Sequence, residues 1–312
     1  IYMEYRKKII VGSRESPLAK AQVDIFLKSF KKLLGTKYFN KIEQKFFKTS
    51  GDKFLEKKIS TIGNKGLFTK EIDEAQLNLK IDIGIHSLKD LPTKLPEGLV
   101  IGAVLKRDDP NDLIMTKAKV KLKDLKKNAV VGTSSIRRAV QIKKLRPDIE
   151  LKEIRGNIGT RISKLKNGEF DAIILACAGL KRLKISEHYQ KIEIKKMIPS
   201  PGQGVIAIVI RKNDDLISIL DKLNDQKTLI ESECERTFLS ALDGSCKTPI
   251  GALARLEVKR KSKILFYYMA ASIDGKKFIK DKTYFDIDNY CKMSFNLGKK
   301  LKEMLWCEDS SY

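Results

Sequence analysis

Four segments of the chain combine small or hydroxyl residues with basic residues in a way that suits anion binding. Each begins where a short apolar run ends and leads into a stretch with helical spacing. They are Gly12–Arg14, His86–Asp90, Gly132–Arg138 and Arg155–Arg161. The free N–H groups at a helix start attract anions, and arginine adds a fork of donors that suits a carboxylate or phosphate. The recurrence predicts one cleft that holds several anionic groups.

Each of these segments taken alone has a simpler interpretation. A serine or threonine before a helix is commonly only an N-cap, and Arg137-Arg138 could lie in an exposed turn. Gly156 and Gly159 are too loosely spaced for a dinucleotide-binding motif, and no Gly-Lys-Ser/Thr phosphate loop occurs in the sequence. The prediction of an anion site therefore depends on the repetition of the pattern.

Asp90 and Cys246 are the candidates for chemistry. Asp90 is an acid among basic residues, so it could form an ion pair with Lys89 or an arginine, or it could accept N–H donors and stabilise a passing cation. Cys246 lies on a Gly/Pro-bounded loop beside a lysine, which favours a thiolate, although most free cysteines are inert core residues. We expect His86 to be a structural, hydrogen-bonded histidine and Cys177 to lie in the core.

Strand-like apolar runs alternate with helical patterns over the first two thirds of the chain. The expected strands are 9–12, 45–48, 81–85, 99–105, 129–132, 151–154, 171–175 and 205–210, and the expected helices are 17–34, 71–79, 136–145, 158–166 and 178–183. Ser16 and Pro17 suit the N-cap and first position of a helix. This alternation predicts mostly parallel sheets covered on both faces, with ligands at the carboxyl ends of the strands.

The last part of the chain has a different pattern. A helix is expected at 230–242, followed by strands at 253–258, 264–272 and 284–287 and a closing helix at 290–305. Strands that follow one another without intervening helices form an antiparallel meander. We therefore expect a small α+β domain at this end.

Composition narrows the class of protein. The five cysteines are odd in number and form no C-x-x-C pair, and only two histidines occur, so neither a disulfide framework nor a metal site is expected. The net charge of +24 draws anions, which leaves nucleic acid, membrane surfaces and polycarboxylates open as ligands. No apolar run is long enough to span a membrane. The chain begins at Ile1; we expect a cytoplasmic location, or a plastid-type organelle if a targeting segment preceded it.

Taken together, these segments resemble the porphobilinogen deaminase (hydroxymethylbilane synthase) family, in the family's order. The matching segments are Gly12–Ala19, Gly66–Phe68, His86–Asp90, Gly132–Arg138, Arg155–Arg161, Asp171–Ala176, Gly179–Leu183, Gly202–Gly204 and the loop around Cys246. The resemblance implies two hinged α/β domains like those of periplasmic binding proteins and a third, α+β domain with a three-stranded antiparallel sheet. The implied domains are 1–107 with 202–222, 108–201, and 223–312, with the hinge near 105–110 and 197–201.

The resemblance also implies the activity. Members of the family are transferases of haem and tetrapyrrole biosynthesis that deaminate four porphobilinogen molecules and join them head to tail. The products are hydroxymethylbilane and ammonia. The chain grows on a dipyrromethane primer held by a thioether, and Cys246 matches the cysteine that carries it. No metal, nucleic acid or membrane is implied, and we expect a monomer.

The family's functional residues map onto this sequence one by one. Asp90 matches the catalytic aspartate, which contacts pyrrole N–H groups and the cofactor. Residues that match the binders of cofactor acetate and propionate groups are Lys89, Thr133, Ser135, Arg137, Arg138, Arg155, Gly156 and Arg161. Residues that match the substrate side are Arg14, Ser16, Lys65, Phe68, Arg155, Arg161, Arg182 and Gln203. Departures from the common pattern at Thr61, Asn64 and Pro201 affect the finer substrate contacts.

Two other classes of function fit parts of the pattern. A non-catalytic, hinged two-domain protein that holds a polyanion would need the same basic strand ends. A nucleic-acid-binding protein would account for the charge, but the basic residues are spread along the chain and no recognised nucleic-acid motif occurs.

Overall fold

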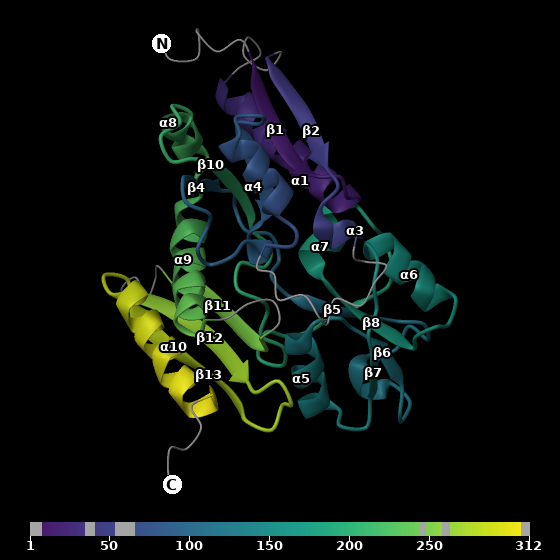
Figure 1. The fold of residues 1–312 in the computed structure, drawn as a ribbon. Coiled ribbons are helices and arrows are strands. Elements are labelled where there is room, and N and C mark those ends of the chain that lie inside the picture. Colours follow the sequence, from purple (N-terminus) through teal and green to yellow (C-terminus); the bar gives the residue numbers. More distant parts are fainter. Residues whose placement is uncertain (1–7, 35–40, 54–65, 244–247, 258–262, 307–312) are drawn as a thin grey trace. The chain divides into compact units, whose positions relative to one another are not determined.

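The computed structural model describes residues 8–34, 41–53, 66–243, 248–257 and 263–306. The chain divides into two compact units. Unit 1 comprises Ile1–Asp108 and Gly204–Leu229, and unit 2 comprises Asp109–Gln203 and Ile230–Tyr312. The chain therefore passes from one unit to the other at 108–109, 203–204 and 229–230. Figure 1 shows the elements along the chain.

Unit 1 is built on a five-stranded sheet in the order β2-β1-β3-β10-β4. Its strands are β1 (Ile9–Arg14), β2 (Ile42–Phe47), β3 (Ile83–Ser87), β4 (Leu99–Val104) and β10 (Ile206–Arg211). β1 pairs in parallel with β2 and β3, whereas β10 is antiparallel to β3 and β4. The helices are α1 (Pro17–Leu34), α3 (Ser50–Lys53), α4 (Lys70–Leu77) and α8 (Ile217–Leu220), with short 3₁₀ turns at Leu88–Asp90 and Asp221–Leu223. Four of the five strands therefore run in one direction and β10 runs against them, which agrees with the predicted, mostly parallel sheet.

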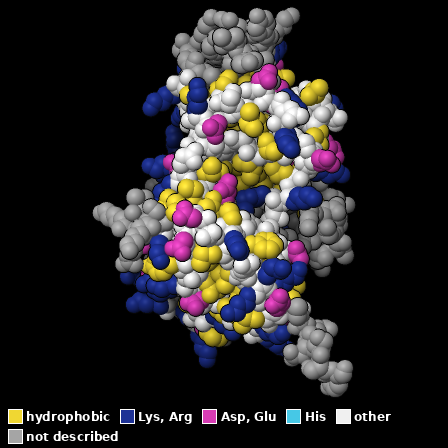
Figure 2. Space-filling view, turned by 90° about the vertical axis from the view of Figure 1, so that its left-hand side faces the viewer, with side chains coloured by type: hydrophobic (Ala, Val, Ile, Leu, Met, Phe, Trp, Pro, Cys, Tyr) yellow, Lys and Arg dark blue, Asp and Glu magenta, His cyan; other side chains and the backbone are white. Residues whose placement is uncertain are grey.

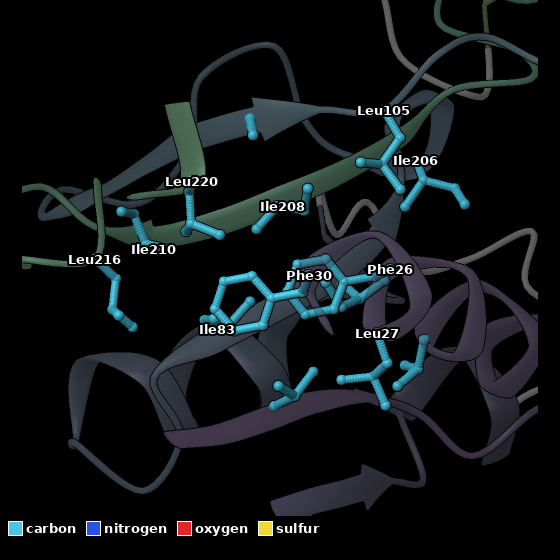
Figure 3. Close-up of a cluster of buried hydrophobic side chains, with 14 of the residues drawn as sticks. Phe26, Leu27, Phe30, Ile83, Leu105, Ile206, Ile208, Ile210, Leu216 and Leu220 are labelled. Atoms are coloured by element: carbon cyan, nitrogen blue, oxygen red, sulfur yellow. The ribbon is translucent and has the colours of Figure 1, made fainter. Parts of the chain in front are cut away.

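Helix α1 covers one face of this sheet. It begins at Pro17 as expected, and the Ser16 hydroxyl accepts a hydrogen bond from the Ala19 N–H at 3.3 Å. Its buried side, which includes Phe26 and Phe30, packs against Ile83 and the other sheet residues drawn in Figure 3. Burying a side chain of this size stabilises a fold by about 1.5–3 kcal/mol. This packing holds the carboxyl ends of β1 and β3 in place.

Helix α4 buries an unusual carboxylate, Asp73. Its Oδ1 has no hydrogen-bond partner among the described residues. Burial raises the pKa of Asp73 to about 6; a hydrogen bond from Thr69 acts against this rise, and the charges of Glu71 and Glu74 add to it. Because the folded pKa lies above that of the unfolded chain, ionised Asp73 destabilises the fold.

The substitution Asp73→Asn should therefore stabilise the protein at pH 8. The penalty of ionised Asp73 is absent below about pH 4 and complete above about pH 6, so the gain should disappear in acid. The shift corresponds to up to about 3 kcal/mol. Urea unfolding of both proteins at pH 8 and pH 4 measures it, and an equal effect at both pH values would contradict the assignment.

Unit 2 contains a second five-stranded sheet with the same plan, in the order β7-β6-β8-β5-β9. Its strands are β5 (Asp112–Thr116), β6 (Val130–Gly132), β7 (Glu150–Lys152), β8 (Ala172–Ala176) and β9 (Gln190–Lys191). Its helices are α5 (Ile136–Leu145), α6 (Ile158–Lys166) and α7 (Cys177–Arg182), with a 3₁₀ turn at Leu122–Asp124. β5 is antiparallel to β8 and β9, as β10 is to its neighbours in unit 1.

Strand β5 was not predicted from the sequence. Only three apolar residues, 113–115, stand between Asp112 and Thr116, both of which would usually be exposed. The fold buries all five residues of the strand, the two polar ones included. Tertiary contacts to those polar side chains therefore decide that this segment is a central strand.

The end of the chain forms the expected antiparallel sheet. Helix α9 (Gln226–Ala241) leads to β11 (Ile250–Glu257), β12 (Lys263–Ala271) and β13 (Phe278–Asp286), and α10 (Tyr290–Trp306) closes the fold. The core between helices and sheet includes the rings of Phe238, Phe266 and Phe285. The prediction started the third strand at residue 284, which was too late, because the charged residues 280–282 lie on an edge strand where they reach solvent.

The fold class is therefore confirmed: two mostly parallel α/β sheets and a three-stranded antiparallel sheet. The division into three domains and the hinge stay predictions. Within the described ranges, no helix has both the length and the apolar composition needed to cross a membrane.

Candidate functional site

Unit 1 has a pocket at the carboxyl ends of β1 and β3. Its volume, open mouth included, is about 370 Å³. The lining includes four residues predicted from the sequence, namely Arg14, Ser16, Phe68 and Asp90. The alternative of a cap holds for Ser16, which also lines the pocket.

Arg14 is fixed in this pocket by a residue that sequence reasoning missed. Its guanidinium forms an ion pair with Asp52 and lies 4.3 Å from the centre of the Phe68 ring. Asp52 also accepts hydrogen bonds from the N–H and hydroxyl of Thr49, at 3.1 and 2.6 Å. Burial pushes the pKa of Asp52 upward, but Arg14 and Thr49 outweigh it and lower the pKa. The acid at the start of α3 therefore stays charged and holds Arg14.

Asp90 is a half-buried carboxylate that lines the pocket. It ends the 3₁₀ turn that follows β3. No hydrogen bond or ion pair joins its carboxylate to the described residues, so the ion pair that the sequence left open is not formed there. A carboxylate at a pocket wall without a partner is available to accept N–H donors from a ligand.

His86 is buried behind this pocket. Its Nε2 has no hydrogen-bond partner in the part of the chain that the structure describes, so the expectation of a hydrogen-bonded histidine fails for this atom. Burial, with help from the charge of Arg14, lowers the pKa of His86 to about 4. The imidazole is neutral at neutral pH and adds no charge to the pocket.

Unit 2 gathers its predicted residues at the corresponding edge of its own sheet. Thr133 and Ser135 follow β6, Arg155 and Gly156 follow β7, and Arg161 lies in α6. Ser135 is the N-cap of α5, since its hydroxyl accepts from the Arg138 N–H at 3.4 Å. Cap and anion site are therefore compatible at this position.

Arg161 is a cation without an acid beside it among the described residues. Its Nε donates to the Gly156 carbonyl at 2.8 Å, and among the described residues no ion pair neutralises it. Burial lowers the pKa of Arg161 to about 10, and the nearby positive charge of Arg138 acts in the same direction. Gathering like charges in a partly buried place is costly unless an anion binds there. Gly156 suits this turn, with φ of +105° and Thr160 only 2.7 Å from where a Cβ would be.

Arg137 and Arg138 are buried in the first turn of α5, so the alternative of an exposed turn is wrong. Both pair with Asp112, the first residue of β5. Gln203 joins the same group, because its Nε2 donates to Asp112 Oδ1 at 2.9 Å and to the Pro110 carbonyl at 2.7 Å. The sequence offered no signal for Asp112, which is an acid in an unpredicted strand.

The remaining predicted residues are less informative. Arg182 ends α7 and is half-buried, Lys89 is half-buried in the 3₁₀ turn, and Arg155 pairs with Glu153 at 2.7 Å. Lys65 and Cys246 lie outside the described residues, as do Thr61 and Asn64. Cys177 is in the core as expected, and burial raises its pKa to about 12. No cluster of His, Cys, Asp or Glu that could hold a metal occurs among the residues with described positions.

On the face shown in Figure 2, the positively charged side chains do not form a single patch. There, lysine and arginine side chains are spread over the face, with acidic side chains between them. A nucleic-acid-binding surface is typically a contiguous basic patch or stripe. The face shown therefore gives no support to the nucleic-acid alternative.

Comparisons with known proteins agree with these observations. The family model described as "Porphobilinogen deaminase, dipyromethane cofactor binding domain" matches residues 9–218, and the model of the porphobilinogen deaminase C-terminal domain matches residues 229–306. The porphobilinogen deaminase of Nitratiruptor sp. is 47% identical over 267 residues, 85% of this chain and 84% of the relative. That of Aliarcobacter butzleri is 40% identical over 296 residues, 94% and 93% of the two chains.

Among solved structures, the chain is similar to substrate binding domain 2 of Lactococcus lactis GlnP in the open conformation. That match has a TM-score of 0.42 and 15% identity, and it covers 70% of this chain and 88% of the other. An ancestral arginine-binding protein matches with a TM-score of 0.37 and 19% identity, covering 70% and 91%.

Proposed function

From the membership of this chain in the porphobilinogen deaminase family, which makes it an enzyme of tetrapyrrole biosynthesis, we propose which of its residues carry the reaction. Asp90 is the catalytic carboxylate. The arginines and hydroxyl residues at the strand ends of unit 2 bind the acetate and propionate groups. Arg14, Ser16 and Phe68 bind on the substrate side.

The observation that carries this proposal is the contrast between the two sets of residues. The pocket of unit 1 contains a carboxylate with no partner among the described residues, Asp90. The corresponding edge of unit 2 contains Arg161, which no described acid neutralises. The first suits pyrrole N–H groups and a developing cation, and the second suits carboxylates.

The chemistry that these residues must support is a substitution at the aminomethyl carbon of porphobilinogen. The C–N bond of the protonated aminomethyl group breaks, ammonia leaves with the bonding electrons, and a cationic carbon remains. A C–C bond then forms to a free pyrrole α-carbon, whose proton leaves. A fixed carboxylate beside the cation, Asp90, lowers the barrier because the charge it stabilises develops in the transition state.

The donor set of unit 2 fits the dipyrromethane cofactor, which carries several carboxylates. Arg161 and Arg137 would hold acetate or propionate groups, and the hydroxyls of Thr133 and Ser135 would donate further hydrogen bonds. When bound, the dipyrromethane supplies the free α-carbon to which the first unit is joined. We propose that Cys246 carries it through a thioether, and that no metal takes part.

Further parts of the proposal concern the state of the protein. We propose a monomer with the third domain at 223–312, a location in the cytoplasm or a plastid-type organelle, and no nucleic-acid or membrane partner. Bacterial relatives support the cytoplasmic alternative.

Incubation of the purified protein with porphobilinogen tests the function. We expect release of four ammonia molecules for each tetrapyrrole, and a product that cyclises without further enzyme to uroporphyrinogen. Oxidation of that product with added iodine then gives uroporphyrin, which is measured by its absorbance near the Soret region. A protein that binds porphobilinogen but releases no ammonia would be a binding protein of the hinged two-domain class, and the proposed function would be wrong.

A further inference from the structure

Asp112 joins three side chains of unit 2 that the family resemblance assigns to ligands. Its Oδ2 accepts from Arg137 Nη1 at 2.7 Å. Its Oδ1 accepts from Arg138 Nη2 and Nε, at 2.7 and 3.1 Å, and from Gln203 Nε2 at 2.9 Å. The carboxylate has no exposed surface. A single buried acid therefore fixes the geometry of two arginines and a glutamine.

This carboxylate is ionised at neutral pH. Burial by itself would raise the pKa of Asp112, but the charges of Arg137 and Arg138, with hydrogen bonds from Arg137 and Gln203, outweigh it and hold the pKa well below its usual range. One acid between two guanidinium groups leaves a net charge of +1. The group as a whole can therefore still attract an anion.

The two arginines use their donors differently. All three side-chain nitrogens of Arg138 are engaged, Nε and Nη2 with Asp112 and Nη1 with the Ile174 carbonyl at 3.0 Å. Arg137 uses Nη1 alone, for Asp112 and for the Ile198 carbonyl at 2.7 Å. Its Nε and Nη2 have no hydrogen-bond partner among the described residues. Neither atom belongs to the fully buried polar atoms that lack a partner. Arg137 thus keeps one edge of its guanidinium unused by the residues that the structure describes.

We propose that Asp112 is a positioning residue that holds Arg137 with this edge available for a carboxylate of the substrate or of the growing pyrrole chain. Arg138 is the second cation that pairs with Asp112 and leaves the group with its net positive charge. The inference rests on the proposed function, because it takes pyrrole acids as the ligands. Asp112 itself touches no ligand in this scheme. It acts through the orientation of Arg137.

The alternative is an ion pair that only stabilises the fold. Removing one partner of a buried ion pair is strongly destabilising whatever its role, so stability alone does not separate the two explanations. The Michaelis constant for porphobilinogen separates the two explanations, because loss of an ion pair that only stabilises the fold leaves this constant unchanged. A matched control is Asp82, whose carboxylate pairs with Arg211 at 2.9 Å within unit 1.

The experiment compares wild type, Asp112→Asn and Asp82→Asn. For each protein, intact mass measures the fraction that carries the primer, thermal unfolding measures stability, and initial rates on the loaded protein measure kcat and KM for porphobilinogen. We expect Asp112→Asn to raise KM about tenfold or more and to lower primer loading, with a smaller change in kcat, since the loss is one of carboxylate binding. Asp82→Asn should lower the unfolding temperature and leave KM unchanged.

A second variant keeps the test decisive if Asp112→Asn does not fold. Asp112→Asn/Arg138→Met removes the acid together with Arg138, the guanidinium that donates two hydrogen bonds to it. The double variant therefore leaves one buried cation fewer without a partner than Asp112→Asn does. Its KM should stay high because Arg137 has still lost its anchor. A wild-type KM and primer loading in either variant would overturn the role of Asp112. Absence of turnover in the wild type would instead refute the proposed function.

Discussion

Asp90→Asn should fold normally and lose nearly all turnover. A positioned carboxylate that acts on a developing charge or proton contributes about 10²–10⁴-fold to rate, and Asp90 is the acid that the unit 1 pocket presents without a described partner. The amide keeps the shape of the side chain but removes its charge. Ammonia release from porphobilinogen, measured in initial-rate assays, gives the loss.

The contacts of Asp90 predict that Asp90→Asn leaves the stability of the fold unchanged. Since the carboxylate makes no hydrogen bond or ion pair with the described residues, unfolding free energy should change by no more than about 0.5 kcal/mol. Asp215→Asn, at an exposed acid of the same unit, is the control and should keep full activity. Near-normal ammonia release by Asp90→Asn would contradict the catalytic role.

The second large effect is expected for Cys246→Ser. Without the thiol no thioether can form, so the variant should have the mass of the polypeptide alone, whereas the wild type should carry an additional mass of two pyrrole units. Turnover should fall to background, because a chain that has no primer has no site for the first addition.

Cys291→Ser provides the control for this experiment. Cys291 is an exposed free cysteine on α10, so it is open to adventitious modification, and its removal should alter neither the adduct nor the rate. Retention of the two-ring mass in Cys246→Ser would show that another residue carries the primer. Loss of the two-ring mass in both variants would show that this loss is not specific to Cys246, and the assignment of Cys246 as the carrier would then fail.

The positions of many residues of the candidate site could be predicted because these residues follow strands. Arg14, Asp90, Thr133, Ser135 and Arg155 come directly after apolar runs, and the carboxyl ends of parallel strands meet at one edge of a sheet. Local order in the sequence is therefore enough to place them. The caps at Ser16 and Ser135 were predictable for the same reason, since a cap depends only on residues within the same turn.

The acids that hold the arginines could not be predicted. Asp52 meets Arg14 from 38 positions away, and Asp112 meets Arg137 and Arg138 from 25 and 26 positions away. Nothing in the neighbouring residues of either acid distinguishes it from an ordinary surface carboxylate.

The amino-acid sequence by itself determined the alternation of elements, the fold class and the identity of the residues at the strand ends, because periodicity, capping and strand direction are local properties. Only the tertiary structure decided which of the arginines are neutralised by a buried acid and which remain available. Arg138 is paired with Asp112, whereas Arg161 has no acid beside it among the described residues. The physical reason is that charge balance depends on distance in space, and a buried ion pair forms between segments that the chain order keeps apart.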